Sequence, residues 1–476
     1  MNLRRLLPPD LKSGAFDHLA IPASAATAHP YSSVWTIQQE IAEGKSGQPN
    51  LCSAYLQVPT GRGHGGIGLT DESGRVHLDH LSSTPLSKRV IEAMNGWSDQ
   101  LFLDPAAPQQ DSAVVLQAVE AARSSIATLL GANHPSEIVF TSGVDEAVSH
   151  AIKGGAWARE RKGRCVVVAT TEHLNVQRTT DWLSHHGFQK RTFSVNSHGI
   201  YDYVSLKSVL DDEVTVVSAH LANHETGIIQ DFSMPANSPE VDAGDEGVAT
   251  ESSLIEVVKT HAKNALIHTD LTAAAGRMEM HLGGSGIDLA SMSGHAIGGP
   301  RGIGVLWVRQ GVRIDSLIHG GGQEGGRRAG PLPVSAIVGL GTAAEQTMEG
   351  LDDSIESMHR LCDRLRKHLA GRMMGATFNT PVKGSVPGVL NLAFSPIAAE
   401  PLLVEVDRHR VAISSSSSCT TSAGEPSHVL IAMGADETMA LAALRVSLSA
   451  NNTQSDIDAL LDALDSSLRT MKRALA

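Results

Sequence analysis

One cysteine and one arginine near the carboxyl end of the chain could act directly on a small substrate. Cys419 lies within residues 414–422, and all the remaining residues of this stretch are serine or threonine. A small, polar stretch of this kind is typical of a loop, and a loop suits a thiol nucleophile that must travel. Arg445 carries a guanidinium fork that can hold a carboxylate through two hydrogen bonds. The structural alternatives are a free surface thiol at Cys419 and a surface or interdomain ion pair at Arg445.

Four further polar residues could bind a planar ligand that carries a phosphate. His173 can stack its ring on another aromatic ring, and Asp270 can keep a ring nitrogen protonated. Ser293 and His295 can each hydrogen-bond a phosphate. Taken alone, His173 could equally be a structural histidine, and Asp270 could be a cap at the end of a strand. Their chemistry therefore depends on the elements that position them.

Strands and helices alternate through the middle of the chain, which predicts a mostly parallel sheet with helices on both faces. Apolar runs predict strands at 137–143, 165–169, 214–218, 265–270 and 303–308, and helical spacing predicts helices at 90–97, 117–130, 147–153, 177–185 and 254–261. Such sheets bind ligands at the carboxyl ends of their strands. The segment Thr141–Gly143 and Asp270 lie at or just past these ends. Ser293 and His295 are expected in the loop that leads into the strand at 303–308.

A second, smaller α/β domain is expected from about residue 334 to residue 476, and it would carry Cys419. Helices are predicted there at 336–349, 355–371, 437–443 and 457–475, with short strands at 388–394 and 411–414. The large domain would span residues 76–333, and residues 76–95 are candidates for packing with the small one. Within the large domain, the acidic and turn-rich residues 233–252 predict an exposed inserted loop. Residues 1–75 form an amino-terminal extension whose role the sequence does not assign.

Several motifs in a shared order resemble the cysteine desulfurases and selenocysteine lyases of aminotransferase class V. The resemblance covers about residues 75–470 and is strongest at Ser291–Gly304, which is similar to the cofactor loop of these pyridoxal-phosphate enzymes. The other matching segments are 140–146, 172–173, 222–227, 268–270, 319–324, 417–419 with 425–427, and 444–448. The resemblance implies the fold-type I architecture, in which a large domain has a mostly parallel seven-stranded sheet between helices.

The resemblance also implies roles for the candidate residues. Cofactor contacts would come from Gly143, Asp145, His173, His224, Asp270, Ser293 and His295. Asp270 would pair with the pyridine nitrogen, which makes the cofactor ring an electron sink. His173 would stack on that ring, and Arg445 would hold the carboxylate of cysteine or selenocysteine. Cys419 would attack the sulfur of the substrate and pass it on, in a homodimer that serves a sulfur-acceptor protein.

The sequence departs from this family at the residue on which the family chemistry depends. Ala296 stands where the family has the lysine that holds the cofactor as a Schiff base, and alanine has no amine. Asp145 replaces a threonine that binds the phosphate, and a carboxylate about 4 Å from a phosphate repels it by about 4 kcal/mol. His224 and Ala273 replace an asparagine and a glutamine beside the ring. Pro331 replaces a threonine and has neither a hydroxyl nor an N–H.

Composition excludes several other classes of protein. The 38 basic and 51 acidic residues give a net charge of −13, which makes nucleic acid a poor partner. No apolar run reaches about 18 residues, so no membrane partner is expected. The four cysteines form no CxxC pair, so neither a metal site nor a disulfide framework is indicated. A cytoplasmic location is expected. The first residues could begin a weak organelle-targeting segment, which stays open although Asp10 and Asp17 argue against it.

Two functions from different classes follow from these observations. In the first, the chain is a desulfurase-like protein with a degenerate pyridoxal-phosphate site, re-purposed in sulfur handling through Cys419 or without activity. In the second, it is an active lyase that binds pyridoxal phosphate without a covalent link and uses His173 or His224 as the base. Because at least four cofactor contacts change together with Ala296, the first is favoured. A binding protein for another small anion in the same cleft is a third possibility.

Overall fold

The computed structural model describes residues 74–99, 103–232, 253–371, 375–416 and 424–475. The chain separates into two compact units, residues 1–65 and 66–476, and all the described residues belong to the second. The amino-terminal extension, the inserted loop at 233–252 and the Cys419 segment therefore lie outside the described residues, apart from the last residues of the extension.

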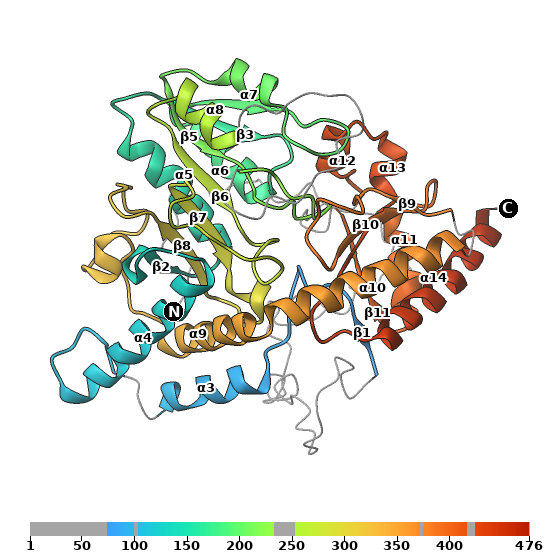
Figure 1. Ribbon diagram of the computed structural model, residues 1–476, viewed down its shortest axis with the longest axis horizontal. Helices are drawn as coiled ribbons and strands as arrows, with labels where there is room; N and C mark the ends of the chain where they lie inside the picture. Colours follow the sequence, from blue (N-terminus) through green and yellow to red (C-terminus); the bar gives the residue numbers. More distant parts are fainter. Residues whose placement is uncertain (1–73, 100–102, 233–252, 372–374, 417–423, 476) are drawn as a thin grey trace, which may run out of the picture. The chain divides into compact units, whose positions relative to one another are not determined.

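A seven-stranded sheet forms the centre of the large domain (Figure 1). Its order is β2-β8-β7-β6-β5-β3-β4, and only β8 runs antiparallel to its two neighbours. The strands are β2 (Ile138–Thr141), β3 (Cys165–Ala169), β4 (Gln189–Phe193), β5 (Val214–Ser218), β6 (Leu266–Asp270), β7 (Leu289–Ser293) and β8 (Gly304–Val308). The sheet is mostly parallel, so the carboxyl ends of most strands meet at one edge, as the sequence predicts.

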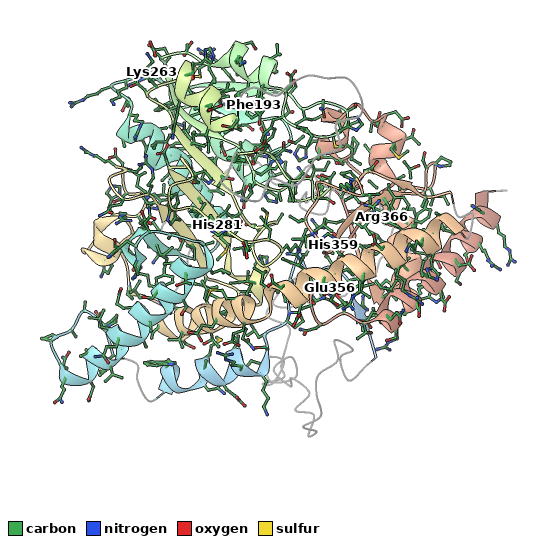
Figure 2. The ribbon with its side chains drawn as sticks, in the orientation of Figure 1. Phe193, Lys263, His281, Glu356, His359 and Arg366 are labelled. Carbon is green, nitrogen blue, oxygen red and sulfur yellow. The ribbon has the colours of Figure 1, made fainter. Side chains whose placement is uncertain are left out.

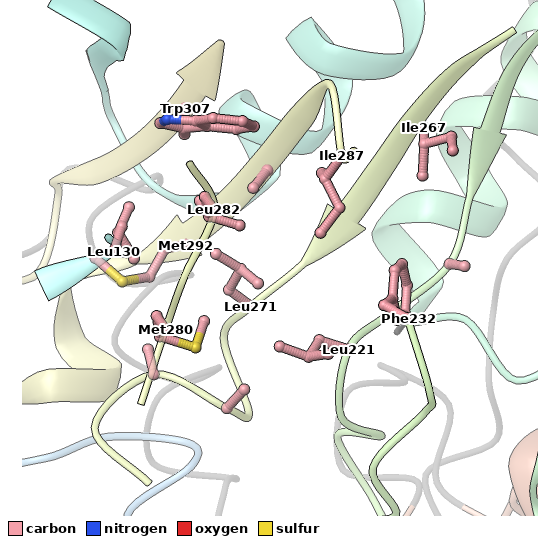
Figure 3. Close-up of a cluster of buried hydrophobic side chains, with 14 of the residues drawn as sticks. Leu130, Leu221, Phe232, Ile267, Leu271, Met280, Leu282, Ile287, Met292 and Trp307 are labelled. Carbon is pink, nitrogen blue, oxygen red and sulfur yellow. The ribbon is translucent and has the colours of Figure 1, made fainter. Parts of the chain in front are cut away.

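Apolar residues cover both faces of this sheet, which explains why its strands are nearly continuous apolar runs. In β3, Val167 packs in one core cluster, while its neighbours Val166 and Val168 pack in another. In β8, Trp307 belongs to the first of these clusters and Leu306 to a third. Figure 3 shows Trp307 in the first cluster together with side chains such as Leu130, Ile267 and Met292.

Helices supply the layers on either side of the sheet. Those of the large domain are α3 (Lys88–Asp99), α4 (Gln110–Leu129), α5 (Val144–Ala158), α6 (Leu174–Ser184), α7 (Tyr203–Val209), α8 (Leu254–His261) and α9 (Val334–Glu349). Helices α5 and α6 contribute to the two smaller clusters, and α4, α8 and α9 contribute to the first. Side chains at the helix starts satisfy free backbone N–H groups, as where Ser253 and Glu256 form a capping box on α8.

The small domain is built on a four-stranded antiparallel sheet with the order β12-β13-β10-β9. Its elements are α10 (Leu351–Gly371), β9 (Thr377–Phe378), β10 (Val389–Ala393), α11 (Ala399–Arg408), β11 (Val411–Ala412), β12 (Ser414–Ser415), α12 (His428–Ala432), α13 (Glu437–Leu441), β13 (Ala443–Ser447) and α14 (Gln454–Leu475). Figure 2 labels Glu356, His359 and Arg366 along α10, which packs against α14. A separate core cluster joins these helices to the sheet.

The predicted fold class is confirmed: a mostly parallel seven-stranded sheet lies between helices, and a smaller domain follows it. Residues 76–95 divide between the two domains, because β1 (Val76–His77) pairs with β11 while α3 packs against α9. The placement of Ser293 in a loop is wrong, since Ser293 is the last residue of β7. The strand has the sequence Leu-Ala-Ser-Met-Ser and is buried along its whole length. Its two serines interrupt the apolar run by which a buried strand would be predicted. The domain boundaries themselves stay predictions.

Candidate active site

Strand ends bring several of the predicted residues to the same edge of the sheet. Asp270 ends β6, Ser293 ends the neighbouring β7, and Gly143 forms the turn between β2 and α5. Gly304, at the start of β8, faces this turn so closely that a Cβ there would lie 2.5 Å from the carbonyl carbon of Gly143. The turn over the predicted phosphate position therefore depends on a close approach of two backbones.

Two histidine rings are in contact above this edge. His173 caps the start of α6, where its Nδ1 accepts a hydrogen bond of 3.2 Å from the N–H of Asn175. The ring of His224 lies edge-on to the ring of His173, with centroids 4.7 Å apart and an interplanar angle of 79°. On another side, His224 stacks with His428 at 6.1 Å. The ring predicted to stack on a cofactor is therefore in contact with another imidazole.

Burial controls the charges of this cluster. It lowers the pKa of His224 well below 6.5, helped by the neighbouring cations and imidazoles, so this ring is neutral near pH 7. Burial also raises the pKa of Glu225 to about 7, against the hydrogen bond that the Ser427 hydroxyl donates to it. The pKa of Asp270 is raised for the same reason, although the N–H of Thr272 donates to its Oδ1 at 2.8 Å.

One backbone N–H of the turn predicted to hold a phosphate already has a protein partner. The Ser142 N–H donates to Glu146 at 2.7 Å, and Glu146 pairs with Arg328 at 2.9 Å. Asp145 is exposed in the first turn of α5 and accepts a hydrogen bond of 2.9 Å from the amide of Asn175. Burial lowers the pKa of His295, and the charge of Asp145 opposes this shift. A phosphate at this helix start would meet a carboxylate beside it.

Ala296 lies in the short 3-10 helix Gly294–Ile297 that follows β7, and its side chain is buried. Among the described residues, no lysine forms a hydrogen bond or an ion pair with Asp270 or His224.

Arg445 is buried and already holds several partners. One Nη atom donates to the carbonyl oxygen of His224 at 3.1 Å, and the other reaches Asp79 at 3.1 Å, with further bonds to Ser82 and Ser414. Its Nε has no partner among the described residues. The ion pair considered for Arg445 is present, with Asp79, which itself bridges to Ser447 of β13, and the bond to the carbonyl oxygen of His224 links β13 to the large domain. The role of Arg445 as a carboxylate ligand stays a prediction.

Cys419 falls in residues 417–423, outside the described part of the chain. The residues that flank this segment are held by β10 and α11 of the small domain. Ser416 accepts a hydrogen bond from the amide of Asn391, and the N–H of Gly424 donates to Glu400 at 3.0 Å. Nearby, Ser427 caps α12 and bonds to Glu225. The segment that contains the cysteine therefore starts and ends on fixed elements.

Sequence reasoning missed part of the polar cluster around the histidines. Glu225, Ser427 and His428 contact one another or His224, yet none was a candidate. All three lie in or next to segments that carry the family resemblance, which was the available signal. No sequence pattern indicated that Glu172 and His220 would be buried together, with Nδ1 of His220 3.7 Å from Oε1 of Glu172 and neither side chain hydrogen-bonded within the described chain.

Comparison with known proteins identifies the family. The aminotransferase class-V family model matches residues 76–237 and 247–460. The chain belongs to that family. A cysteine desulfurase IscS of Clostridium botulinum is 34% identical to it over 392 residues, which cover 82% of this chain and 93% of the relative. The predicted relationship to the cysteine desulfurases of aminotransferase class V is therefore confirmed.

Solved structures of the aminotransferase class-V type agree with this assignment. A NifS-like protein superimposes with a TM-score of 0.74 and 30% identity, covering 83% of this chain and all of that one. SspA in complex with cysteine superimposes with a TM-score of 0.64 and 28% identity, over 78% of this chain and 98% of the other. Both relatives are spanned almost completely, so this chain has the whole architecture of their fold.

The residues present do not fit pyridoxal phosphate in the manner of the family. Asp270 and His173 lie where a ring could be held, but the amine is absent at Ala296 and an acidic side chain stands at the phosphate turn. Within the described residues no group of three histidine, cysteine or acidic side chains is arranged to hold a metal ion instead. No described helix is long and apolar enough to cross a bilayer.

Proposed function

We propose that this chain is a cysteine desulfurase-like protein with a degenerate pyridoxal-phosphate site. It would be catalytically impaired, or re-purposed in sulfur handling through Cys419. The observation that carries the proposal is the buried Ala296 after β7, and no described lysine hydrogen-bonds or pairs with Asp270 or His224. Family chemistry needs an amine there, first to hold the cofactor and then to move a proton.

Two other contacts support the same conclusion. The ring of His224 contacts the ring of His173, and Asp145 adds a negative charge at the start of α5, where a phosphate would otherwise be favoured. Cysteine or selenocysteine is the proposed substrate class, with Arg445 as its carboxylate ligand, because a structural relative was solved with cysteine. A homodimer, a sulfur-acceptor protein and a cytoplasmic location belong to the same proposal.

The alternative is an active lyase with a cofactor that is bound without a covalent link. One observation favours it: the carbonyl of His224 accepts a hydrogen bond from Arg445, so a neutral imidazole stands beside the predicted carboxylate ligand. However, burial lowers the pKa of His224 well below 6.5, and such an imidazole is a weak base at pH 7. The degenerate site is therefore the better supported function.

Restoring the lysine tests the proposal directly. The full-length protein, Ala296→Lys and the length-matched control Ala296→Met are incubated with pyridoxal phosphate, reduced with borohydride and analysed by mass spectrometry. Only Ala296→Lys is expected to retain the cofactor covalently at residue 296. Alanine and sulfide production from cysteine is measured in parallel, with Cys419→Ala as a background.

The unmodified chain is expected to release no more alanine than this background. Turnover by the unmodified chain at rates typical of enzymes, about 1–10³ per second, would overturn the proposal. A lysine-linked absorption band in the unmodified protein would do the same. If Ala296→Lys gains turnover, the loss is confined to the amine, and if it does not, the other changed contacts contribute to the degeneracy.

A further inference from the structure

A cavity of about 270 Å³ lies on the side of Ala296 that faces the junction of the two domains. Neither His173, His224 nor Asp270 lines it. Its walls come from the segment after β1, the turn after β6, the 3-10 helix, the α9–α10 junction and the loop after β13. The lining residues are Thr84, Pro85, Ser87, Gly276, Arg277, Ala296, Ile297, Gly298, Gln346, Thr347, Ser354, Met358, Leu448, Ser449, Ala450 and Asn451.

Arg277 is the only ionised side chain in this wall, and it is 4% exposed. Its guanidinium donates one hydrogen bond within the described residues, from Nη2 to the carbonyl oxygen of Leu448 at 3.1 Å. Its Nε is buried without a partner. A guanidinium has five N–H donors, so most of its hydrogen-bonding capacity is unused by the described protein.

No described carboxylate compensates the charge of Arg277. Arg445, which is also buried, adds a like charge near Arg277, and the thiol of Cys362 is another titratable group that acts on it. Burial raises the pKa of that thiol to about 11, so it is neutral near pH 7. Among the described residues Arg277 forms no ion pair, whereas the buried Arg123 and Arg445 pair with Glu324 and Asp79. An unpaired buried charge is strongly unfavourable, so a counter-ion would be favoured.

Two other polar groups of the wall can donate to a ligand, whereas the hydroxyls of Thr84, Thr347 and Ser354 already donate to backbone carbonyl oxygens. The Ser87 hydroxyl donates to the Oε1 atom of Gln346 at 2.6 Å, which leaves the amide nitrogen of Gln346 for another acceptor. Ser449 accepts from the N–H of Asn451 at 3.3 Å, so its own hydroxyl proton is available. The wall contains no aspartate and no glutamate. Its volume lies just below that of pockets for drug-sized ligands, which is about 300–1,000 Å³.

We propose that this cavity binds a small oxyanion, either inorganic phosphate or sulfate or the carboxylate of a small organic acid, against the guanidinium of Arg277. Gln346 would donate a second hydrogen bond. Because elements of both domains line the cavity, the ligand would join the α9–α10 junction to the loop after β13. The proposal is independent of whether a cofactor binds at the strand ends.

Binding is tested on the full-length chain by thermal unfolding and calorimetric titration. Phosphate, sulfate, acetate and succinate are the probes, and potassium chloride at equal ionic strength is the control. At least one class of anion is expected to raise the melting temperature in a saturable way below about 10 mM, since even a millimolar ligand is then in excess. The comparison of inorganic with organic anions shows which source supplies the ligand.

Variants separate a site from general salt stabilisation, which sulfate and phosphate also produce. Arg277→Met is expected to abolish saturable binding, and Arg277→Lys and Gln346→Leu are expected to weaken it at least about tenfold, because a bidentate partner or a donor is lost. Arg89→Met, in the exposed pair with Glu349, is the matched control and should bind as the parent does. If Arg277→Met does not fold, the other two variants carry the test.

Two results would overturn the proposal. The first is the absence of saturable binding of every probe to the parent chain. The second is binding of equal affinity in the parent and in the Arg277 and Gln346 variants.

Discussion

At the scale of single residues, the cluster of Glu225, His224 and His428 is governed by burial rather than by ion pairing. The imidazoles lie 3.7 Å and 3.9 Å from the Glu225 carboxyl, which is too far for a hydrogen bond, and the hydroxyl of Ser427 is its hydrogen-bond donor. In the folded protein this cluster therefore favours neutral forms, with a protonated glutamate and uncharged imidazoles.

A glutamate held neutral in this way makes stability depend on pH. Burial raises the pKa of Glu225 from 4.5 to about 7, so between these values the folded state holds a proton that the unfolded state has lost. The contribution of Glu225 to the free energy of unfolding therefore falls as pH rises from about 4.5 to 7. Relative to Glu225→Gln, the parent should lose about 3 kcal/mol across this window. Urea unfolding of both proteins at several pH values measures the difference.

A variant that removes the hydrogen-bond donor to Glu225 is the control for this pH dependence. Ser427→Ala removes the bond that opposes the shift, so it should move the window to higher pH while keeping the glutamate. Parallel stability curves for the parent and Glu225→Gln from pH 4.5 to 8 would contradict the assignment.

At the scale of elements, the start of β8 and the turn before α5 constrain each other. A Cβ on Gly304 would meet backbone atoms of Gly143 at 2.5–2.9 Å, and a backbone cannot move aside as a flexible side chain can. The same turn carries Asp145 and the backbone N–H groups at the predicted phosphate position. The glycine therefore preserves the shape of the candidate site as well as the strand pairing.

Gly304→Ala should destabilise the protein by about 1–3 kcal/mol or more, because overpacking against a fixed backbone forces neighbouring elements apart. Gly96→Ala is the matched control. This glycine lies within α3 and has open space around it, so alanine there should stabilise by about 0.4–1 kcal/mol. Urea unfolding gives both values, and a neutral effect of Gly304→Ala would show that the two segments can separate without cost.

At the scale of the whole molecule, the large and small domains have separate hydrophobic cores. Leu461 and its neighbours on α14 belong to the small-domain cluster, whereas Ile267 belongs to the cluster around the large sheet. The tryptophans that the structure describes, Trp97, Trp157, Trp182 and Trp307, all lie in elements of the large domain. Tryptophan fluorescence therefore reports on unfolding of the large domain, whereas circular dichroism reports on unfolding of both domains.

Unfolding should accordingly depend on the probe, since chains with two cores often depart from two-state behaviour. In a Trp35→Phe background, which removes the one tryptophan outside the described residues, Leu461→Ala should cost the small domain about 2–5 kcal/mol. The circular-dichroism midpoint should fall while the fluorescence midpoint changes little. Ile267→Ala should lower the fluorescence midpoint instead. Coincident transitions that shift equally in both variants would show one cooperative unit.

The sequence by itself determined the family, the order of most elements and the missing amine. Such features are local: an apolar run predicts a strand, helical spacing predicts a helix, and Ala296 lacks a nitrogen in any fold. The predicted elements at 165–169, 214–218 and 254–261 match their observed bounds. Even here β7 was missed, because its serines obscured a strand whose burial is decided by neighbours distant in sequence.

Only the tertiary structure decided how the polar groups meet. The contact of His224 with His173, the neutral environment of Glu225 and the cavity at Arg277 each join segments far apart in the chain. Residue type and spacing do not record which side chains share a buried volume, and burial sets their charge. The physical reason is that desolvation depends on everything packed around a group, whereas sequence patterns report only its neighbours along the backbone.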